Sequence, residues 1–158
     1  MPRKRAWVQY VEKRHSTTLD HHEARVDLET LTATQSEIEF IKYYMVRDEA
    51  FREDEPILVY KGRFGGYFII DGHTRARVDW DKGDRTIHAV VYTSPDADVP
   101  EELIRIALDA GAGRERRIWE VPVVDRVGKG TPAWESRKQE LLAEWKVELE
   151  SHREKGTS

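Results

Sequence analysis

Hydrophobic residues form two compact runs in the middle of the chain, at residues 57–60 and 67–71. Both runs are rich in β-branched and aromatic residues, which favour β-strands. The intervening residues 61–66, KGRFGG, hold three glycines that allow a tight reversal of the chain. The pattern therefore predicts a β-hairpin.

A strand and a helix are predicted before this hairpin. Residues 24–31 alternate between polar and apolar positions, which is typical of a strand, and apolar residues then recur at helical intervals over residues 38–45. Thr34 and Glu37 have the spacing of a capping box, in which two side chains satisfy free N–H groups of the first helical turn. We therefore expect a helix that begins near Thr34.

The rest of the chain continues the alternation of helical and extended patterns. We expect a strand over residues 85–93, an extended segment over 117–127, and helices over 76–82, over 100–111 and from about residue 132 onward. In the last helix, Trp134, Leu141, Trp145 and Leu149 lie toward one face. That face is predicted to pack on the domain.

Composition and charge narrow the class of protein. The chain has 158 residues, no cysteine and a formal net charge of −4, with 39% hydrophobic and 35% charged residues. That length suits one domain, and the lack of cysteine excludes disulfides and thiol catalysis. A negative net charge argues against a surface that binds DNA as a whole, but it permits a local basic groove. A helix that spans a bilayer needs about 20 apolar residues, and this sequence has no such run. We therefore expect a cytoplasmic protein without membrane contact.

The patterns divide the chain into three parts. Residues 1–23 are charged and weakly periodic, which predicts an N-terminal arm or a short strand. Residues 24–125 hold the alternating strands and helices of the main domain, and residues 126–158 form a C-terminal helix. The expected fold class is α/β, with a mixed sheet and helices packed against it.

The joint between the hairpin and the next helix carries the candidate chemistry. Asp71, Gly72, His73, Thr74 and Arg75 follow a strand directly and open a helix. Glycine lets backbone N–H groups approach a ligand there, and the helix dipole favours negative charge. His73 and Thr74 add donors, and Arg75, expected to be exposed in a cleft, could bind a phosphate with two hydrogen bonds. The alternative is that Asp71 only caps the helix and Gly72 only bends the chain.

These residues carry a resemblance to a known superfamily. The segment EPILVYKGRFGGYFIIDGHTRARVDWDKGDRTIHAVVY, preceded by VDLETLTATQSEI, resembles the core domain shared by ParB-type proteins and sulfiredoxin. The resemblance covers residues 25–92, and its most specific element is the Asp-Gly-His-X-Arg turn after a hairpin. It implies a ParB/sulfiredoxin-like α/β fold that binds a nucleotide at residues 72–75.

Three branches of that superfamily differ in the turn. Sulfiredoxin has Gly-Cys-His-Arg, and histidine replaces the cysteine here, so sulfinic acid repair is not expected. Chromosome-partition ParB proteins have Gly-Glu-Arg-Arg, bind CTP and continue into further domains, for which this chain has little room. The archaeal ADP-dependent free-serine kinase is the most similar branch. It pairs a histidine-containing phosphate turn with an acidic residue early in the first helix, a position that Glu37 matches.

The kinase resemblance implies roles for individual residues. Backbone donors of residues 72–75 and the Arg75 guanidinium would hold the phosphates of ADP or ATP, with Mg²⁺ carried by the nucleotide. Glu37 would orient or deprotonate a small hydroxyl-bearing substrate such as serine, unless it only completes the capping box. Asp71 would position Mg²⁺ or a water. We expect phosphoryl transfer or nucleotide hydrolysis; the alternatives are a nucleotide-responsive DNA-associated module of the partition or plasmid-accessory kind and a ParB-like nuclease.

Two further clusters are candidate sites. Residues 113–119, GRERRIW, join three arginines to Trp119, which would suit a nucleic-acid backbone or a second phosphate, although a solvated corner explains them as well. His21 and His22 are adjacent and would point to opposite faces of a strand, so we predict no resident metal site.

Overall fold

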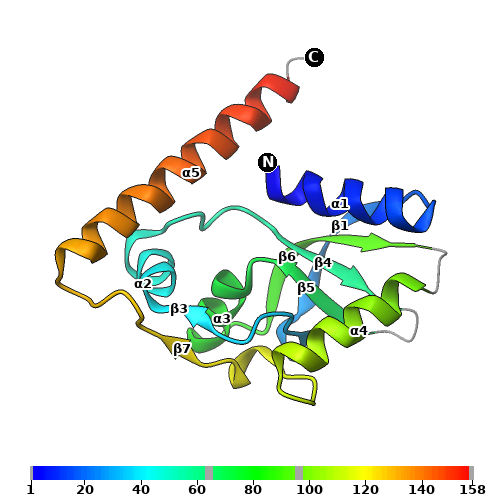
Figure 1. Ribbon diagram of the computed structural model, residues 1–158, viewed down its shortest axis with the longest axis horizontal. Helices are drawn as coiled ribbons and strands as arrows, with labels where there is room; N and C mark the ends of the chain where they lie inside the picture. Colours follow the sequence, from blue (N-terminus) through cyan, green and yellow to red (C-terminus); the bar gives the residue numbers. More distant parts are fainter. Residues whose placement is uncertain (1, 63–65, 95–97, 157–158) are drawn as a thin grey trace.

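The described part of the chain contains one five-stranded mixed sheet. The computed structural model describes residues 2–62, 66–94 and 98–156. The sheet consists of β1 (Asp20–Asp27), β2 (Leu31–Thr32), β4 (Ile57–Lys61), β5 (Tyr67–Asp71) and β6 (Thr86–Thr93), in the order β1-β6-β4-β5-β2 (Figure 1). β4 and β5 are antiparallel and form the predicted hairpin, whereas β4 is parallel to β6. The α/β prediction with a mixed sheet is confirmed.

Helices and short elements complete this arrangement. Among the described residues the α-helices are α1 (Pro2–His15), α2 (Phe40–Glu49), α3 (His73–Asp81), α4 (Asp98–Ala110) and α5 (Pro132–Gly156). Two single 3₁₀ turns, η1 (Leu28–Thr30) and η2 (Ile118–Glu120), flank the sheet, and β3 (Ile38–Glu39) pairs with β7 (Val123–Val124) in parallel. No helix in the described ranges is long and apolar enough to cross a membrane.

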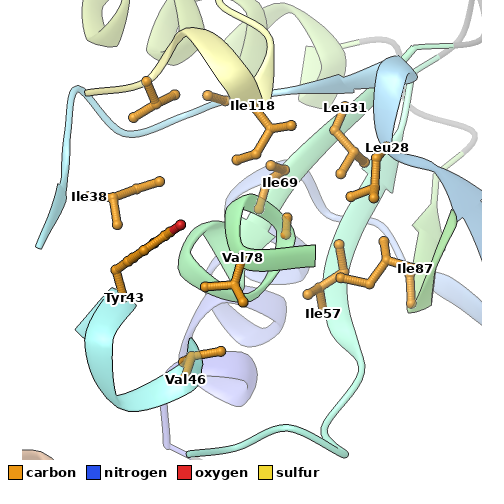
Figure 2. Packing of buried hydrophobic residues seen from close by; sticks show 14 of the residues in the cluster. Leu28, Leu31, Ile38, Tyr43, Val46, Ile57, Ile69, Val78, Ile87 and Ile118 are labelled. Carbon is orange, nitrogen blue, oxygen red and sulfur yellow. The ribbon is translucent and has the colours of Figure 1, made fainter. Parts of the chain in front are cut away.

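One face of the sheet holds the larger core. Alternate strand residues such as Ile57, Val59, Ile69 and Ile87 are almost completely buried on this face. Figure 2 shows Ile57, Ile69 and Ile87 close to Val78 of α3, with further side chains of α2 and η2 around them. Because successive side chains of a strand point to opposite faces, Ile57 and Val59 of β4 lie on this face and Tyr60 lies on the other.

The opposite face is covered by α1 and α4, and here the prediction of an N-terminal arm was wrong. Val11 of α1 is 3% exposed and packs in a second core with Tyr60, Phe68 and Leu103. The helix was missed because its apolar residues are few, and tertiary contacts with the sheet decide its conformation. Residues 20–23 belong to β1, which agrees with the short strand predicted as the alternative to an arm.

The predicted capping box is also absent, because α2 begins later than expected. Its N-cap is Glu39, and Thr34 and Glu37 lie before β3 and α2. The Thr34 hydroxyl donates to the carbonyl oxygen of Ile69, and the Thr34 amide donates to Nε2 of His73 at 2.9 Å. Contacts with β5 and α3, both distant in the sequence, therefore replace the local cap that the spacing predicted.

Helix α5 packs on the domain as predicted. Trp134 is 5% exposed, and its ring lies 5.8 Å from that of Phe40 and 5.7 Å from that of Tyr44. Leu141 is also buried, whereas Leu149 is 36% exposed and does not share the packed face fully. Figure 1 shows α5 running along one side of the domain, with its C-terminal end extending past the sheet.

Candidate functional site

The turn before α3 is built around Gly72. This residue is the N-cap of α3 and has φ = 110°, a backbone conformation that residues other than glycine rarely adopt. A Cβ atom at this position would lie 2.4 Å from Cγ2 of Ile57 and 3.0 Å from Nη2 of Arg75. Glycine is therefore required both by the backbone angle and by the space behind it.

His73 is a buried structural acceptor. Its side chain is 4% exposed, and Nε2 accepts a hydrogen bond from the amide of Thr34. Burial lowers the pKa of His73 to about 4, so the ring is neutral at pH 7. Because Nε2 accepts, the proton of the neutral ring resides on Nδ1. His73 thus ties the turn to the segment before β3 through Nε2, and this nitrogen is not available to a ligand.

Arg75 is buried as well, which corrects the expectation that it is exposed in a cleft. It is 6% exposed, and its Nη1 donates to the carbonyl oxygens of Glu55 at 2.7 Å and Pro56 at 3.1 Å. Nη2 lies 3.4 Å from Oδ2 of Asp71. The guanidinium is held by backbone carbonyls about 20 positions earlier in the chain. The local sequence pattern does not predict these hydrogen bonds.

A cleft of about 530 Å³ opens beside this turn. Gly72 and Thr74 line it from the turn, Lys42 from α2, and Leu141 and Trp145 from α5. The volume falls within the usual range for small-molecule sites. The N-terminal end of α3, where backbone N–H groups are free of intrahelical partners, therefore faces a space that can hold a ligand.

Glu37 lines the same cleft, although it is not in a helix. Its carboxylate accepts two hydrogen bonds from Arg126, at 2.6 and 2.7 Å. These bonds lower the pKa of Glu37, which makes it a weaker base. The structure thus brings Glu37 to the cleft that also contains the turn, as the sequence predicted, and adds Arg126, which the sequence reasoning missed.

Asp71 ends β5 next to the turn. It does not cap α3, since the N-cap is Gly72, which has no side chain. Oδ2 of Asp71 lies 3.4 Å from Nη2 of Arg75 and 3.9 Å from Nη2 of Arg52. Across the described ranges, no group of three or more His, Asp or Glu side chains could hold a metal ion. A metal at Asp71 would need other ligands, such as phosphate oxygens.

Several residues of the site were not predicted from the sequence. Arg52 lies in the loop after α2, Lys42 in the first turn of α2, and Glu148 on α5, where it is 8% exposed. One sequence feature could have found Glu148, since it falls three positions after Trp145 on the packed stripe of α5. A carboxylate on a buried stripe needs a cationic partner.

The arginines near η2 are engaged within the protein. Arg114 forms an ion pair with Glu120, and Arg117 donates to the Thr32 hydroxyl at 3.0 Å. Trp119 stacks on Trp80 with ring centroids 4.7 Å apart. These contacts favour the solvated-corner interpretation of residues 113–119 over a nucleic-acid grip.

Comparison with known proteins gives structural neighbours only. No protein-family model matches the chain, and no curated protein matches it. Protein Atu1540 from Agrobacterium tumefaciens is similar, with a TM-score of 0.43 and 16% identity over 67% of this chain and 63% of that chain. A pNOB8-like ParB N-domain has a TM-score of 0.35 and 20% identity, covering 61% of this chain and 35% of that one.

A second structure, of the C2221 form of a pNOB8-like ParB N-domain, has a TM-score of 0.36 and 17% identity over 87% of this chain and 50% of that chain. The chain thus spans less than two thirds of the length of each of these structures. ParB N-domains are among the proteins to whose folds this chain is similar.

Proposed function

We propose that the protein binds a nucleoside diphosphate or triphosphate in the cleft beside α3, and that it transfers the terminal phosphoryl group to a small hydroxyl compound or to water. The observation that carries this proposal is the N-terminal end of α3, which has glycine as its N-cap and borders a cleft of about 530 Å³. Free N–H groups and the helix dipole together favour a phosphate at such a position.

The donors for the phosphates come from backbone and side chains on two sides of the cleft. The amides of residues 73 and 74 and the Thr74 hydroxyl supply hydrogen bonds from the turn. Lys42 and Arg126 line the cleft from other elements and supply positive charge. Arg75 contributes indirectly, because its bonds to Glu55 and Pro56 fix the position of the turn.

The reaction places an acceptor hydroxyl near Glu37. The hydroxyl oxygen forms a bond to the terminal phosphorus, the bond from phosphorus to the bridging oxygen breaks, and the shortened nucleotide leaves with the electron pair. The hydroxyl proton passes to Glu37 or to water. Since Arg126 lowers the pKa of Glu37, the main role proposed for this carboxylate is to orient the acceptor.

Magnesium would enter with the nucleotide. Mg²⁺ favours phosphate oxygens and water and commonly takes only one or two protein carboxylates. Asp71 lines the cleft and is the carboxylate next to the phosphate position. Its oxygen is 3.4 Å from Arg75, so an added cation would share the carboxylate with that arginine.

Binding is tested by calorimetry with ADP, ATP, CTP and GTP in the presence of Mg²⁺. Thr74→Val and Lys42→Gln should each weaken nucleotide binding, by about 0.5 to 3 kcal/mol for a lost hydrogen bond or charged contact. Lys61→Gln is the matched control, because Lys61 is exposed at the end of β4 and does not line the cleft. Equal affinities in all four proteins, or no binding by the wild type, would refute the proposal.

Chemistry is tested separately from binding. Glu37→Gln should keep nucleotide affinity but reduce release or transfer of labelled phosphate by about 10² or more, with serine among the acceptors. Glu29→Gln serves as the control, since Glu29 is exposed in η1. If the two variants turn over at the same rate, Glu37 has no role in the transfer step.

A further inference from the structure

A buried cluster of charges lies behind the turn, at the inner end of the cleft. It joins the guanidinium groups of Arg52 and Arg75 to the carboxylates of Glu55, Asp71 and Glu148. Two cations thus face three anions in a region largely removed from water. Such a cluster is stable only while each charge keeps its partners.

The backbone directs Arg52 into this cluster by an uncommon conformation. Arg52 has φ = 56° and Ala50, the C-cap of α2, has φ = 53°. Two left-handed residues other than glycine within three positions are rare, and such conformations persist where the surroundings fix them. The Nε of Arg52 donates to Oε2 of Glu55 at 2.7 Å, which holds one side of the guanidinium.

The other side of the Arg52 guanidinium faces Glu148 of α5. Nη2 of Arg52 lies 2.9 Å from Oε2 of Glu148, so the two charges form an ion pair. Yet both atoms are fully buried without a hydrogen bond to any described residue. The pair therefore has the attraction of opposite charges without the directional bond that a better-placed oxygen would form.

Helix α5 connects this pair to the wall of the cleft. Nε1 of Trp145 donates to Oε1 of Glu55 at 2.9 Å, and Trp145, Glu144 and Leu141 line the cleft. Arg52 lines the same cleft. One outward movement of this part of α5 would therefore withdraw Glu148 from Arg52 and widen the space beside the turn.

We propose that Glu148 is an internal competitor of the phosphate ligand. Its carboxylate holds the Arg52 guanidinium, a phosphate oxygen takes its place on ligand binding, and that exchange releases the C-terminal half of α5. Arg52 is then a ligand-binding residue, and α5 reports the occupancy of the cleft. The inference rests on the proposed function, because it requires that the cleft bind phosphate.

The affinity for inorganic pyrophosphate tests the competition. Glu148→Gln removes the competing charge and should tighten pyrophosphate binding by about three- to tenfold, as measured by calorimetry. Glu144→Gln is the matched control, since it removes the same charge from the cleft wall one turn earlier on α5. Equal gains in the two variants would show a general charge effect and overturn the proposal.

Hydrogen exchange of α5 provides a second measurement on the wild-type protein. Pyrophosphate should speed exchange of the amides of residues 142–150 by at least about threefold and leave α4 unchanged. Trp145→Phe removes the indole N–H that bonds α5 to Glu55, but it leaves the Glu148 side chain unaltered. It should also tighten pyrophosphate binding, and it decides the question if Glu148→Gln does not fold.

The outcomes separate this inference from the proposed function. If the wild type binds pyrophosphate but neither Glu148→Gln nor Trp145→Phe changes the affinity, the competition is refuted and phosphate binding in the cleft stands. If α5 exchange stays constant on binding, the release of α5 is refuted. If neither the wild type nor the variants bind any phosphate ligand, the proposed function and this inference both fail.

Discussion

Nη1 of Arg75 lies 2.7 Å from the carbonyl oxygen of Glu55, so the arginine of the turn is bonded to the backbone of a distant loop. A phosphate would have to displace this bond and a second one to Pro56 in order to bind the same nitrogen. The main role of Arg75 is therefore to stabilise the fold. Its effect on a ligand is indirect, because it fixes the loop and the turn that border the cleft.

Replacement of Arg75 should accordingly destabilise the protein. Arg75→Met leaves the carbonyls of Glu55 and Pro56 without their donor and Asp71 with only the more distant Arg52, and loss of one partner of a buried charge pair costs roughly 3 to 5 kcal/mol. Urea unfolding followed by circular dichroism measures this loss. Arg105→Met, on the exposed side of α4, is the control. An unchanged unfolding midpoint with abolished nucleotide binding would assign Arg75 to the ligand instead.

His73 predicts a dependence of stability on pH. Its folded pKa is about 4, whereas a histidine in the unfolded chain has a pKa near 6.5. Between these values the unfolded chain binds the proton and the folded protein does not. Stability should therefore fall as the pH drops from 6.5 toward 4, by at most about 3 kcal/mol from this residue.

The comparison that isolates this effect is His73→Gln, whose amide oxygen can accept from Thr34 but does not titrate. Unfolding free energies at pH 4.5 and 7 should differ less in the variant than in the wild type. The same difference in both proteins would mean that other groups cause the pH dependence. If NMR shows that the His73 imidazole titrates near pH 6.5 in the folded protein, the argument that burial lowers its pKa is contradicted directly.

Two glycines with similar backbone angles separate strain from crowding. Gly72 has φ = 110° and Gly83 has φ = 94°, but only Gly72 has atoms where a Cβ would lie. Gly83→Ala should carry the cost of the backbone alone. Gly72→Ala adds the collision with Ile57 and should be less stable than Gly83→Ala by about 1 to 3 kcal/mol. Equal melting temperatures would show that the start of β4 around Ile57 shifts at little cost in stability.

The packing of α5 predicts a marked effect of Trp134. Trp134→Ala leaves a cavity between α5 and α2 and should lower the free energy of unfolding by roughly 3 to 5 kcal/mol. Val147→Ala, at a position that is 57% exposed, should change it by less than about 0.5 kcal/mol. Chemical denaturation distinguishes the two. A small effect at Trp134 would mean that α5 is held mainly by ion pairs, such as that of Lys138 with Glu49 of α2 and that of Arg137 with Glu39.

The parts of the fold that were predicted correctly rest on local patterns. The β4–β5 hairpin follows from its glycines and β-branched residues, and α4 ends at Ala110, one residue before the end expected from its helical pattern. The start of α2 was wrong because Thr34 bonds to residues 35 and 39 positions further along. Such contacts depend on the folded sheet, and spacing along the chain does not contain them.

The candidate site divides in the same way. The turn and the glycine that opens α3 could be located from the sequence, because a backbone requirement leaves a local trace. The roles of its side chains could not be predicted from the sequence. His73 and Arg75 form hydrogen bonds with Thr34 and Glu55, which lie in other segments of the chain. Glu37 does line the cleft, but its partner Arg126 lies 89 positions later.

The strand order β1-β6-β4-β5-β2 has a consequence for biosynthesis. β1 is synthesised first, yet its partner along the whole strand is β6, from Asp20 opposite Thr93 to Asp27 opposite Thr86. At a ribosomal rate of 5 to 20 residues per second, β1 waits roughly 3 to 15 seconds for that partner. Trp7 of α1 waits as well, because its ring packs on Tyr60 and Tyr92. The hydrophobic residues with which α1 and β1 pack on the sheet therefore stay exposed until β6 has been synthesised.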